Sequence, residues 1–302
     1  MEAILIQAGC YVMIIVMGYL LRRVGFFKAS DFDVLARIVL KITLPCAIVK
    51  NFAGKQIDPA MLSILLISVG GGLVYMGLGY LLNRRRGKEE QAFYTLNYSG
   101  YNIGNFAMPF VQSFLGPMGL LAVSLFDSGN AFICLGGAYS VACLIKEKRP
   151  FSFARIGRAL LKSVPFDCYM IMLFMNLTRI PVPTPIVTFA GIGANANAFL
   201  AMLMVGIGFK LSGDKSQRGQ IAKTLIVRYG VAALLALGCW CLLPFELDVR
   251  KALVLLCFSP ISTSVPAFTA DMKSDVGLSS ALSSVTIVCS IALMTLLLVL
   301  MA

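Results

Sequence analysis

The sequence contains no histidine among its 302 residues. This absence excludes catalytic triads, general bases and metal sites that depend on an imidazole. Nine cysteines are present, but they are scattered, mostly through apolar runs, and no Cys-x-x-Cys pair occurs. We interpret them as small buried apolar side chains, and we predict neither a catalytic residue nor a metal site.

Charge is also scarce in this chain. Asp, Glu, Lys and Arg make up 13% of the residues, whereas 59% are hydrophobic and the mean hydropathy is +0.86. A soluble domain carries roughly 25% charged residues, and so few polar groups cannot coat a surface that faces water. We therefore predict an all-α membrane protein.

Ten apolar segments follow one another along the chain. Most reach the roughly 17–25 residues that a helix needs to cross the hydrocarbon layer of a membrane. They cover residues 3–21, 33–53, 61–83, 91–113, 118–145, 164–180, 186–209, 221–243, 249–271 and 278–301. Residues 152–163, which precede the short sixth segment, are expected to form an amphipathic turn or helix on the membrane surface.

Lysine and arginine are distributed unevenly between the loops. Eighteen of the 26 lie in one alternating set of loops, at residues 22–28, 84–88, 146–162, 210–223 and 273, and five lie in the other set. Because short cytoplasmic loops carry the excess of Lys and Arg, both termini are predicted to be extracytoplasmic in a protein of the cell membrane. The net charge of +12 then follows from topology, and we predict a lipid bilayer but no nucleic acid as partner.

Two short matches indicate an internal repeat. Cys10-Tyr11 recurs as Cys168-Tyr169 in segments one and six, and Pro109 recurs as Pro266 in segments four and nine. These offsets divide the ten segments into two halves of five, residues 1–150 and 151–302. Because five is odd, the second half must be inverted relative to the first, as in many secondary transporters.

Segments four and nine each combine proline with asparagine, glycine or hydroxyl side chains. Proline lacks a backbone N–H, and backbone groups freed inside a membrane must face protein or a watered cavity. Two broken helices at corresponding positions of a repeat indicate a transport site, where the N-termini of the half-helices attract anions. We expect the two breaks to cross at mid-membrane. The predicted substrate-binding residues are Asn102, Asn105, Pro109, Pro260, Ser262, Thr263 and Ser264.

Several charged side chains lie inside the apolar segments. Asp127 is the clearest carboxylate, and Asn130 shares its helix face. Because a carboxylate is costly in lipid, Asp127 is predicted either to couple an ion or to brace the broken helices. Lys41 is a candidate to attract an anion, whereas Arg37 at the membrane surface needs no such role. For Arg228, pairing with a carboxylate is one hypothesis.

Several motifs, in order along nearly the whole chain, carry a family resemblance. They are Thr43-Leu44-Pro45; Gly104 to Pro109 with Phe114-Leu115-Gly116; Asp127-Ser128-Gly129-Asn130; Asn195 through Gly206 with Gly208; and Pro260 with Ala270-Asp271 and the serine-rich stretch Leu278 to Ser284. Together they resemble the auxin efflux carrier family. The chain is similar to prokaryotic permeases, because it lacks the long cytoplasmic loop of the plant hormone carriers. The chain departs from the family's pattern at two places, Ala107-Met108 before Pro109 and the hydroxyl-rich Ser262-Thr263-Ser264. Both departures bear on which substrate is carried and not on the fold.

The resemblance implies a fold like that of the bile-acid sodium symporters, in which a transport domain moves against a scaffold domain. It also implies carriage of small carboxylates such as malate, malonate or auxin-like acids, and the expectation of a homodimer through the scaffold helices. We therefore predict a secondary active or facilitative transporter of small organic anions that works by alternating access.

Other classes of function are weighed against this prediction. A sodium-coupled bile-acid-like symporter is the nearest alternative, and a ligand-binding membrane sensor is a remote one. An intramembrane enzyme would need a second mid-span acid or a magnesium-binding cluster of acids, so we predict that the chain is not an enzyme. No cofactor is predicted, and coupling to protons, to sodium or to no ion stays open.

Overall fold

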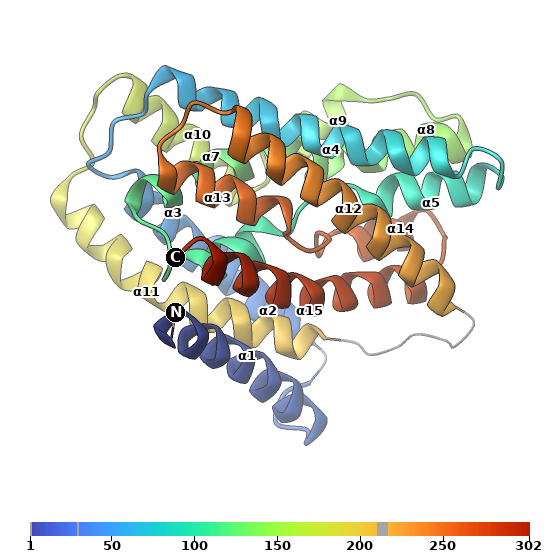
Figure 1. Cartoon of the computed structure of the whole chain (residues 1–302), viewed down its shortest axis with the longest axis horizontal. Coiled ribbons are helices and arrows are strands. Elements are labelled where there is room, and N and C mark those ends of the chain that lie inside the picture. The colour runs from blue at the N-terminus through green and yellow to red at the C-terminus, as the bar shows by residue number, and fades with distance from the viewer. Residues whose placement is uncertain (1, 29, 210–216) are drawn as a thin grey trace.

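The computed structural model describes residues 2–28, 30–209 and 217–302, and these are 80% helical, with no strand among them. The long helices lie side by side along one axis of the molecule (Figure 1). The α-helices are α1 (Glu2–Arg23), α2 (Asp31–Ile38), α3 (Leu44–Phe52), α4 (Ser63–Leu82), α5 (Lys88–Tyr98), α6 (Met108–Val111), α7 (Pro117–Phe132), α8 (Ala138–Glu147), α9 (Phe153–Leu160), α10 (Val164–Leu177), α11 (Thr184–Gly208), α12 (Arg218–Leu242), α13 (Leu247–Cys257), α14 (Val265–Asp271) and α15 (Val276–Leu300). A 3₁₀ turn, η2 (Pro59–Leu62), precedes α4, and three π-helical turns are η1 (Val39–Thr43), η3 (Ile103–Ala107) and η4 (Ile133–Gly137).

The helices confirm a multi-pass membrane protein. Within the described residues, six helical stretches are long and apolar enough to cross a membrane, or seven if α9 and α10, bent by 82°, form one span. They coincide with seven of the ten predicted segments. The other three predicted segments, 33–53, 91–113 and 249–271, are built from shorter helical pieces. The amphipathic helix expected at residues 152–163 is α9, whose first turn is capped by the Ser152 hydroxyl.

The ends of the bundle differ in what they carry. Figure 1 shows both chain termini at one end, and the connections from α4 to α5 and from α8 to α9 at the other end. These two connections carry Arg84, Arg85, Arg86, Lys148 and Arg149. Two further basic residues of this predicted set, Lys210 and Lys215, lie outside the described residues. The described basic loops therefore gather at the end opposite the termini.

The helices pack in two groups. The first, which we call the α11 group, contains α1, α2 and α3, which pack on α11, and α10, which packs on α3. The second, the α5 group, contains α4, α5, α7, α8 and α12 to α15. Each group takes helices from both sides of residue 150, so the packing does not follow the predicted halves. The boundary of the repeat stays a prediction.

Close packing within the α11 group depends on glycine. A Cβ placed on Gly206 of α11 would lie 2.1 Å from the Ile15 carbonyl oxygen of α1. A Cβ on the facing Gly18 would lie 2.6 Å from the Leu203 oxygen. Small residues allow such close backbone approach in membranes, where packing replaces the hydrophobic effect as the force that joins helices.

Replacing Gly206 by alanine should separate α1 from α11. We expect Gly206→Ala to lower the stability of the protein by about 1–3 kcal/mol, because the added methyl group has no room. Gly191→Ala is the matched control, since it lies on the same helix with nothing within 4 Å of the new Cβ. Thermal unfolding of both variants in detergent tests this, and equal midpoints would contradict it.

Candidate functional site

The two predicted broken helices meet in the interior of the bundle. The first is interrupted between Tyr98, where α5 ends, and Ile103, where η3 begins; the second between Cys257 and Val265. The Asn102 backbone N–H donates to the Pro260 carbonyl across 2.9 Å. The Asn105 amide donates to the Thr263 hydroxyl across 3.1 Å. Residues from both halves of the sequence are thus in direct contact at the breaks.

The first break has a local cause at Gly100. Its φ of +76° lies in the left-handed region, which glycine adopts without strain. A Cβ at this position would also lie 2.7 Å from the Cys134 sulfur. Pro109, in contrast, lies beyond the break in the first turn of α6, where proline is tolerated. The break therefore arises at Gly100, and Pro109 is buried outside the cavity described below.

Arg228 of α12 joins both breaks through their backbones. Its guanidinium donates to the carbonyls of Tyr98 and Gly100 at 2.6 and 2.9 Å, and to those of Ser259 and Pro260 at 3.0 and 3.2 Å. The side chain is 1% exposed. It stacks over two tyrosine rings, one of them Tyr101 at 5.5 Å. The hypothesis that Arg228 pairs with a carboxylate is wrong, because the groups that accept its hydrogen bonds among the described residues are backbone carbonyls.

Arg228 binds the carbonyl of Tyr98, the last residue of α5, and the carbonyls of Gly100, Ser259 and Pro260, which lie in the breaks just after α5 and α13. The last carbonyls of a helix have no partner within it, and the helix dipole places partial negative charge there. A cation at these positions satisfies both requirements at once. Arg228 therefore places positive charge just after the C-terminal ends of α5 and α13, where the helix dipoles favour it.

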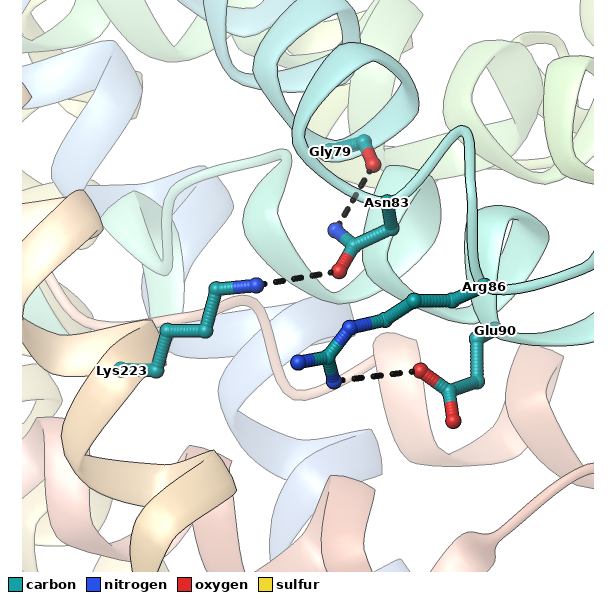
Figure 2. A network of polar contacts seen from close by, with 5 residues as sticks. All are labelled: Gly79, Asn83, Arg86, Glu90 and Lys223. Atoms are coloured by element: carbon teal, nitrogen blue, oxygen red, sulfur yellow. Dashed lines mark hydrogen bonds and ion pairs between the residues drawn. The ribbon is translucent and has the colours of Figure 1, made fainter.

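A second contact of α12 fixes this helix at the basic end of the bundle. Figure 2 shows Lys223 reaching the Asn83 side chain, which itself donates to the Gly79 carbonyl. The Lys223–Asn83 distance is 3.3 Å, and Asn83 is fully buried at the end of α4. Arg86 and Glu90 pair beside them at 3.4 Å (Figure 2). Lys223 lies five residues before Arg228, so this contact anchors the helix that carries the arginine.

Asn130 holds the extended segment of the first break as a strand partner would. Its side-chain oxygen accepts from the Tyr101 N–H at 3.0 Å, and its side-chain nitrogen donates to the Tyr101 carbonyl at 2.7 Å. The same nitrogen lies 3.3 Å from an oxygen of Asp127. The predicted pair Asp127 and Asn130 is therefore in contact with the break, and Asn130 supports its backbone directly.

Asp127 also joins the two packing groups. Its second oxygen accepts a hydrogen bond from the Tyr169 hydroxyl of α10 at 2.9 Å. Asp127 lies on α7 in the α5 group, whereas α10 belongs to the α11 group. Sequence analysis did not select Tyr169, although the repeat carried a signal: its counterpart Tyr11 makes a similar bond, to Ser113, at 2.6 Å.

A cavity of about 100 Å³ lies against the first break. Five of the predicted residues line it: Asn102, Asn105, Asp127, Asn130 and Ser262. The Asn102 side-chain nitrogen is buried and has no hydrogen-bond partner among the described residues. The cavity therefore presents a spare amide donor next to a carboxylate.

Thr263, Ser264 and Lys41, which were also predicted to belong to the site, do not line the 100 Å³ cavity. Thr263 lines a second cavity of about 310 Å³, together with Arg22 of α1 and Ser283 of α15. Ser264 donates to the Cys134 carbonyl at 3.2 Å. Lys41 lies on η1 with an exposed side chain and does not line the 100 Å³ cavity. Its role in attracting an anion stays a prediction.

A closed polar triangle holds the second broken helix against the first. The Ser279 hydroxyl donates to Asn97 at 2.6 Å, Asn97 donates to Thr269 at 3.3 Å, and Thr269 donates to Ser279 at 3.2 Å. All three side chains are fully buried. Because each group has a partner, the triangle joins α5, α14 and α15 without leaving a polar group unsatisfied.

The second break is also held from α15, by a residue that sequence analysis missed. The Thr286 hydroxyl accepts from the Ile261 N–H at 3.2 Å. A serine or threonine in an apolar helix gives little sign in the sequence of such a contact. Elsewhere in the described ranges, no three His, Cys, Asp or Glu side chains come close enough to hold a metal ion.

Comparison with known protein families gives one match. Residues 9–152 match the family described as membrane transport protein, the family of the auxin efflux carriers. The matched region includes the first broken helix, Asp127 and Asn130. The search of curated proteins finds no match.

Removing the arginine should destabilise both breaks together. We expect Arg228→Met to lower stability by about 3 kcal/mol or more, because four buried carbonyls lose a charged donor. Arg228→Lys should lie between this variant and the parent, since one ammonium cannot reach all four oxygens. Lys223→Met is the control on the same helix, because it removes the hydrogen bond to Asn83 and leaves the contacts of Arg228 with the breaks unchanged. If thermal unfolding gave equal midpoints for Arg228→Met and Lys223→Met, the bracing role would be wrong.

Proposed function

We propose that this chain, which is a membrane transport protein of the auxin efflux carrier family, carries small organic anions across the cell membrane. Transport would be secondary active or facilitative and would proceed by alternating access. The substrates would be carboxylates such as malate, malonate or auxin-like acids.

The observation that carries the proposal is the distribution of charge at the crossing. Arg228 places a permanent positive charge on the C-terminal ends of α5 and α13 and is paired with no carboxylate. The N-terminus of η3 faces the same break, and the Asn102 amide donor beside it has no partner among the described residues. These features favour an anion, because amide donors and positive charge stabilise carboxylates. Asp127 lines the same cavity, so its charge would have to be neutralised by a proton or a cation when the anion binds.

The arrangement of the chain supports the inverted-repeat topology that we propose. Ten spans in two inverted halves, 1–150 and 151–302, would bring both termini to one side of the membrane, and Figure 1 has them at one end of the bundle. The basic loops at the other end favour extracytoplasmic termini. The contacts between 98–105 and 259–263 are those expected if helices four and nine cross.

Alternating access would be a movement of the α5 group against the α11 group. The cavity lined by Arg22 and Thr263 lies between them at one end of α1. Two hydrogen bonds of tyrosine hydroxyls link the α11 group to residues outside it: Tyr11 of α1 bonds to Ser113, which lies between α6 and α7, and Tyr169 of α10 bonds to Asp127 of α7. Each would have to break or follow the movement, so Asp127 is suited to respond to a proton or a sodium ion during transport.

Ligand-induced stabilisation tests the class of substrate. The purified protein should unfold at a higher temperature with a mono- or dicarboxylate present at about 100 times its Kd, which corresponds to about 2.7 kcal/mol. Malate, malonate and indole-3-acetate, each with and without sodium at two pH values, form the panel, and matched neutral and cationic solutes are the controls. Stabilisation by the control solutes alone would contradict transport of anions.

Asp127→Asn separates ion coupling from bracing. Asparagine carries no charge and keeps one oxygen that can accept from Tyr169, so the contact to α10 is preserved, whereas its NH2 group replaces the oxygen that accepts from Asn130 and that 3.3 Å contact is lost. We expect folded protein whose uptake is abolished or has lost its dependence on pH or sodium. Tyr169→Phe is the control, because it removes the hydrogen bond and keeps the carboxylate. Unchanged uptake and pH dependence in Asp127→Asn would remove Asp127 from the mechanism.

A further inference from the structure

A polar cavity of about 420 Å³ lies between the two packing groups, away from the crossing. We call it the Lys50 cavity. Helices α1, α3 and α11 line one side, and the turn after α6 and the start of α7 line the other. Its polar lining is Gln7, Lys50, Asn51, Gln112, Ser113 and Asn195.

The Lys50 cavity lies at the opposite end of the molecule from the cavity lined by Arg22. Both cavities touch α1, one at Gln7 and the other at Arg22. Fifteen residues of α-helix separate these positions, which corresponds to about 22 Å. Both also touch α11, at residues 194–199 and 205–208 respectively. The two cavities therefore open along the same group interface toward opposite ends.

The charge of the Lys50 cavity has one sign. Lys50 is the charged residue in its described lining, and no carboxylate is part of that lining. The ammonium donates to the Asn195 side-chain oxygen at 3.0 Å, which uses one of its three hydrogens. An ammonium with donors to spare and no acid beside it attracts an anion.

Amide groups supply the rest of a carboxylate site. Gln7 and Gln112 are half-buried, and their side chains make no hydrogen bond to the described residues. Asn51 donates to Ser124 at 3.4 Å and keeps its second amide hydrogen. The cavity thus combines one cation with several amide donors, the combination that orients a small carboxylate.

Aromatic side chains separate the Lys50 cavity from the crossing. Tyr11, which lines the cavity, lies with its ring centroid 5.8 Å from that of Phe110. Phe110 stacks on Phe106 at 5.9 Å, and both phenylalanines are fully buried. Phe106 directly follows Asn105 of the crossing. The stack therefore forms a continuous apolar barrier from the floor of the cavity to the candidate site.

We propose that the Lys50 cavity is a second binding site for a small carboxylate, with Lys50 as its charge partner. It receives the anion on the face opposite the Arg22 cavity, while the stack of Tyr11, Phe110 and Phe106 closes the way to the crossing. That the bound anion is then carried rests on the proposed function; that the cavity binds it does not.

Charge-selective labelling tests the binding site directly. Leu120→Cys places a thiol in the cavity lining of the full chain without removing an amide donor, and the protein is reconstituted in vesicles of phosphatidylcholine so that no anionic lipid competes. Labelling rates are measured with an anionic and a cationic methanethiosulfonate, after subtraction of the rate of the parent with its native cysteines. We expect the anionic reagent to be favoured, and Lys50→Ala to reduce the anionic-to-cationic ratio about fivefold. Malonate should slow the labelling only when Lys50 is present.

Lys55→Ala is the matched control, because Lys55 follows α3 at the same end but lines a different cavity. It should leave the ratio and the protection by malonate unchanged. A ratio that Lys50→Ala does not change, or equal protection by malonate without Lys50, would overturn the proposal. Because labelling needs no transport, protection by malonate without malonate flux would overturn the proposed function and keep this site.

Discussion

The fold depends on what happens to the backbone where two helices stop inside a membrane. The Arg228 guanidinium binds four carbonyls at the breaks, those of Tyr98, Gly100, Ser259 and Pro260, of which the Pro260 carbonyl also accepts from the Asn102 N–H. An unsatisfied group there costs several kcal/mol, so the broken helices and the buried arginine require each other. The arginine in turn needs α12 in place, which the contact from Lys223 to Asn83 secures.

The hydrogen bonds that hold the two breaks come from both packing groups, but more of them come from the α5 group. Asn130, Thr286 and the Asn97–Thr269–Ser279 triangle all lie within the α5 group, and they hold the breaks to one another. The hydrogen bonds to the α11 group include those of the Tyr11 and Tyr169 hydroxyls and that of Asn51 with Ser124, and of these the one from Tyr169 reaches Asp127 beside the first break. The two breaks are therefore joined most closely within the α5 group, and such an arrangement is suited to move as a unit.

The sequence allowed the main features to be predicted because they follow from local rules. Low charge and long apolar segments indicated membrane helices, and Asn102, Asn105, Ser262 and Thr263 were predicted from their positions in segments that cannot stay helical. The partner of Arg228 was predicted wrongly, since carbonyls leave no mark in a sequence. The position of Lys41 depends on the rotation of η1, and that of Pro109 on a break that begins at Gly100, neither of which composition reveals.

The hydrogen bonds through which Asn130 and Arg228 hold the two breaks are made to backbone atoms and not to the side chains of the residues in the breaks. Asn130 and Arg228 bind main-chain atoms of residues 98–101 and 259–260, so apart from Gly100, whose conformation makes the first break, these contacts do not require particular side chains at those positions. Related chains can therefore vary the residues at the breaks, and with them the solute that is accepted, on an unchanged frame. Such a division lets one ancestral scaffold diversify in specificity by substitutions that cost little stability.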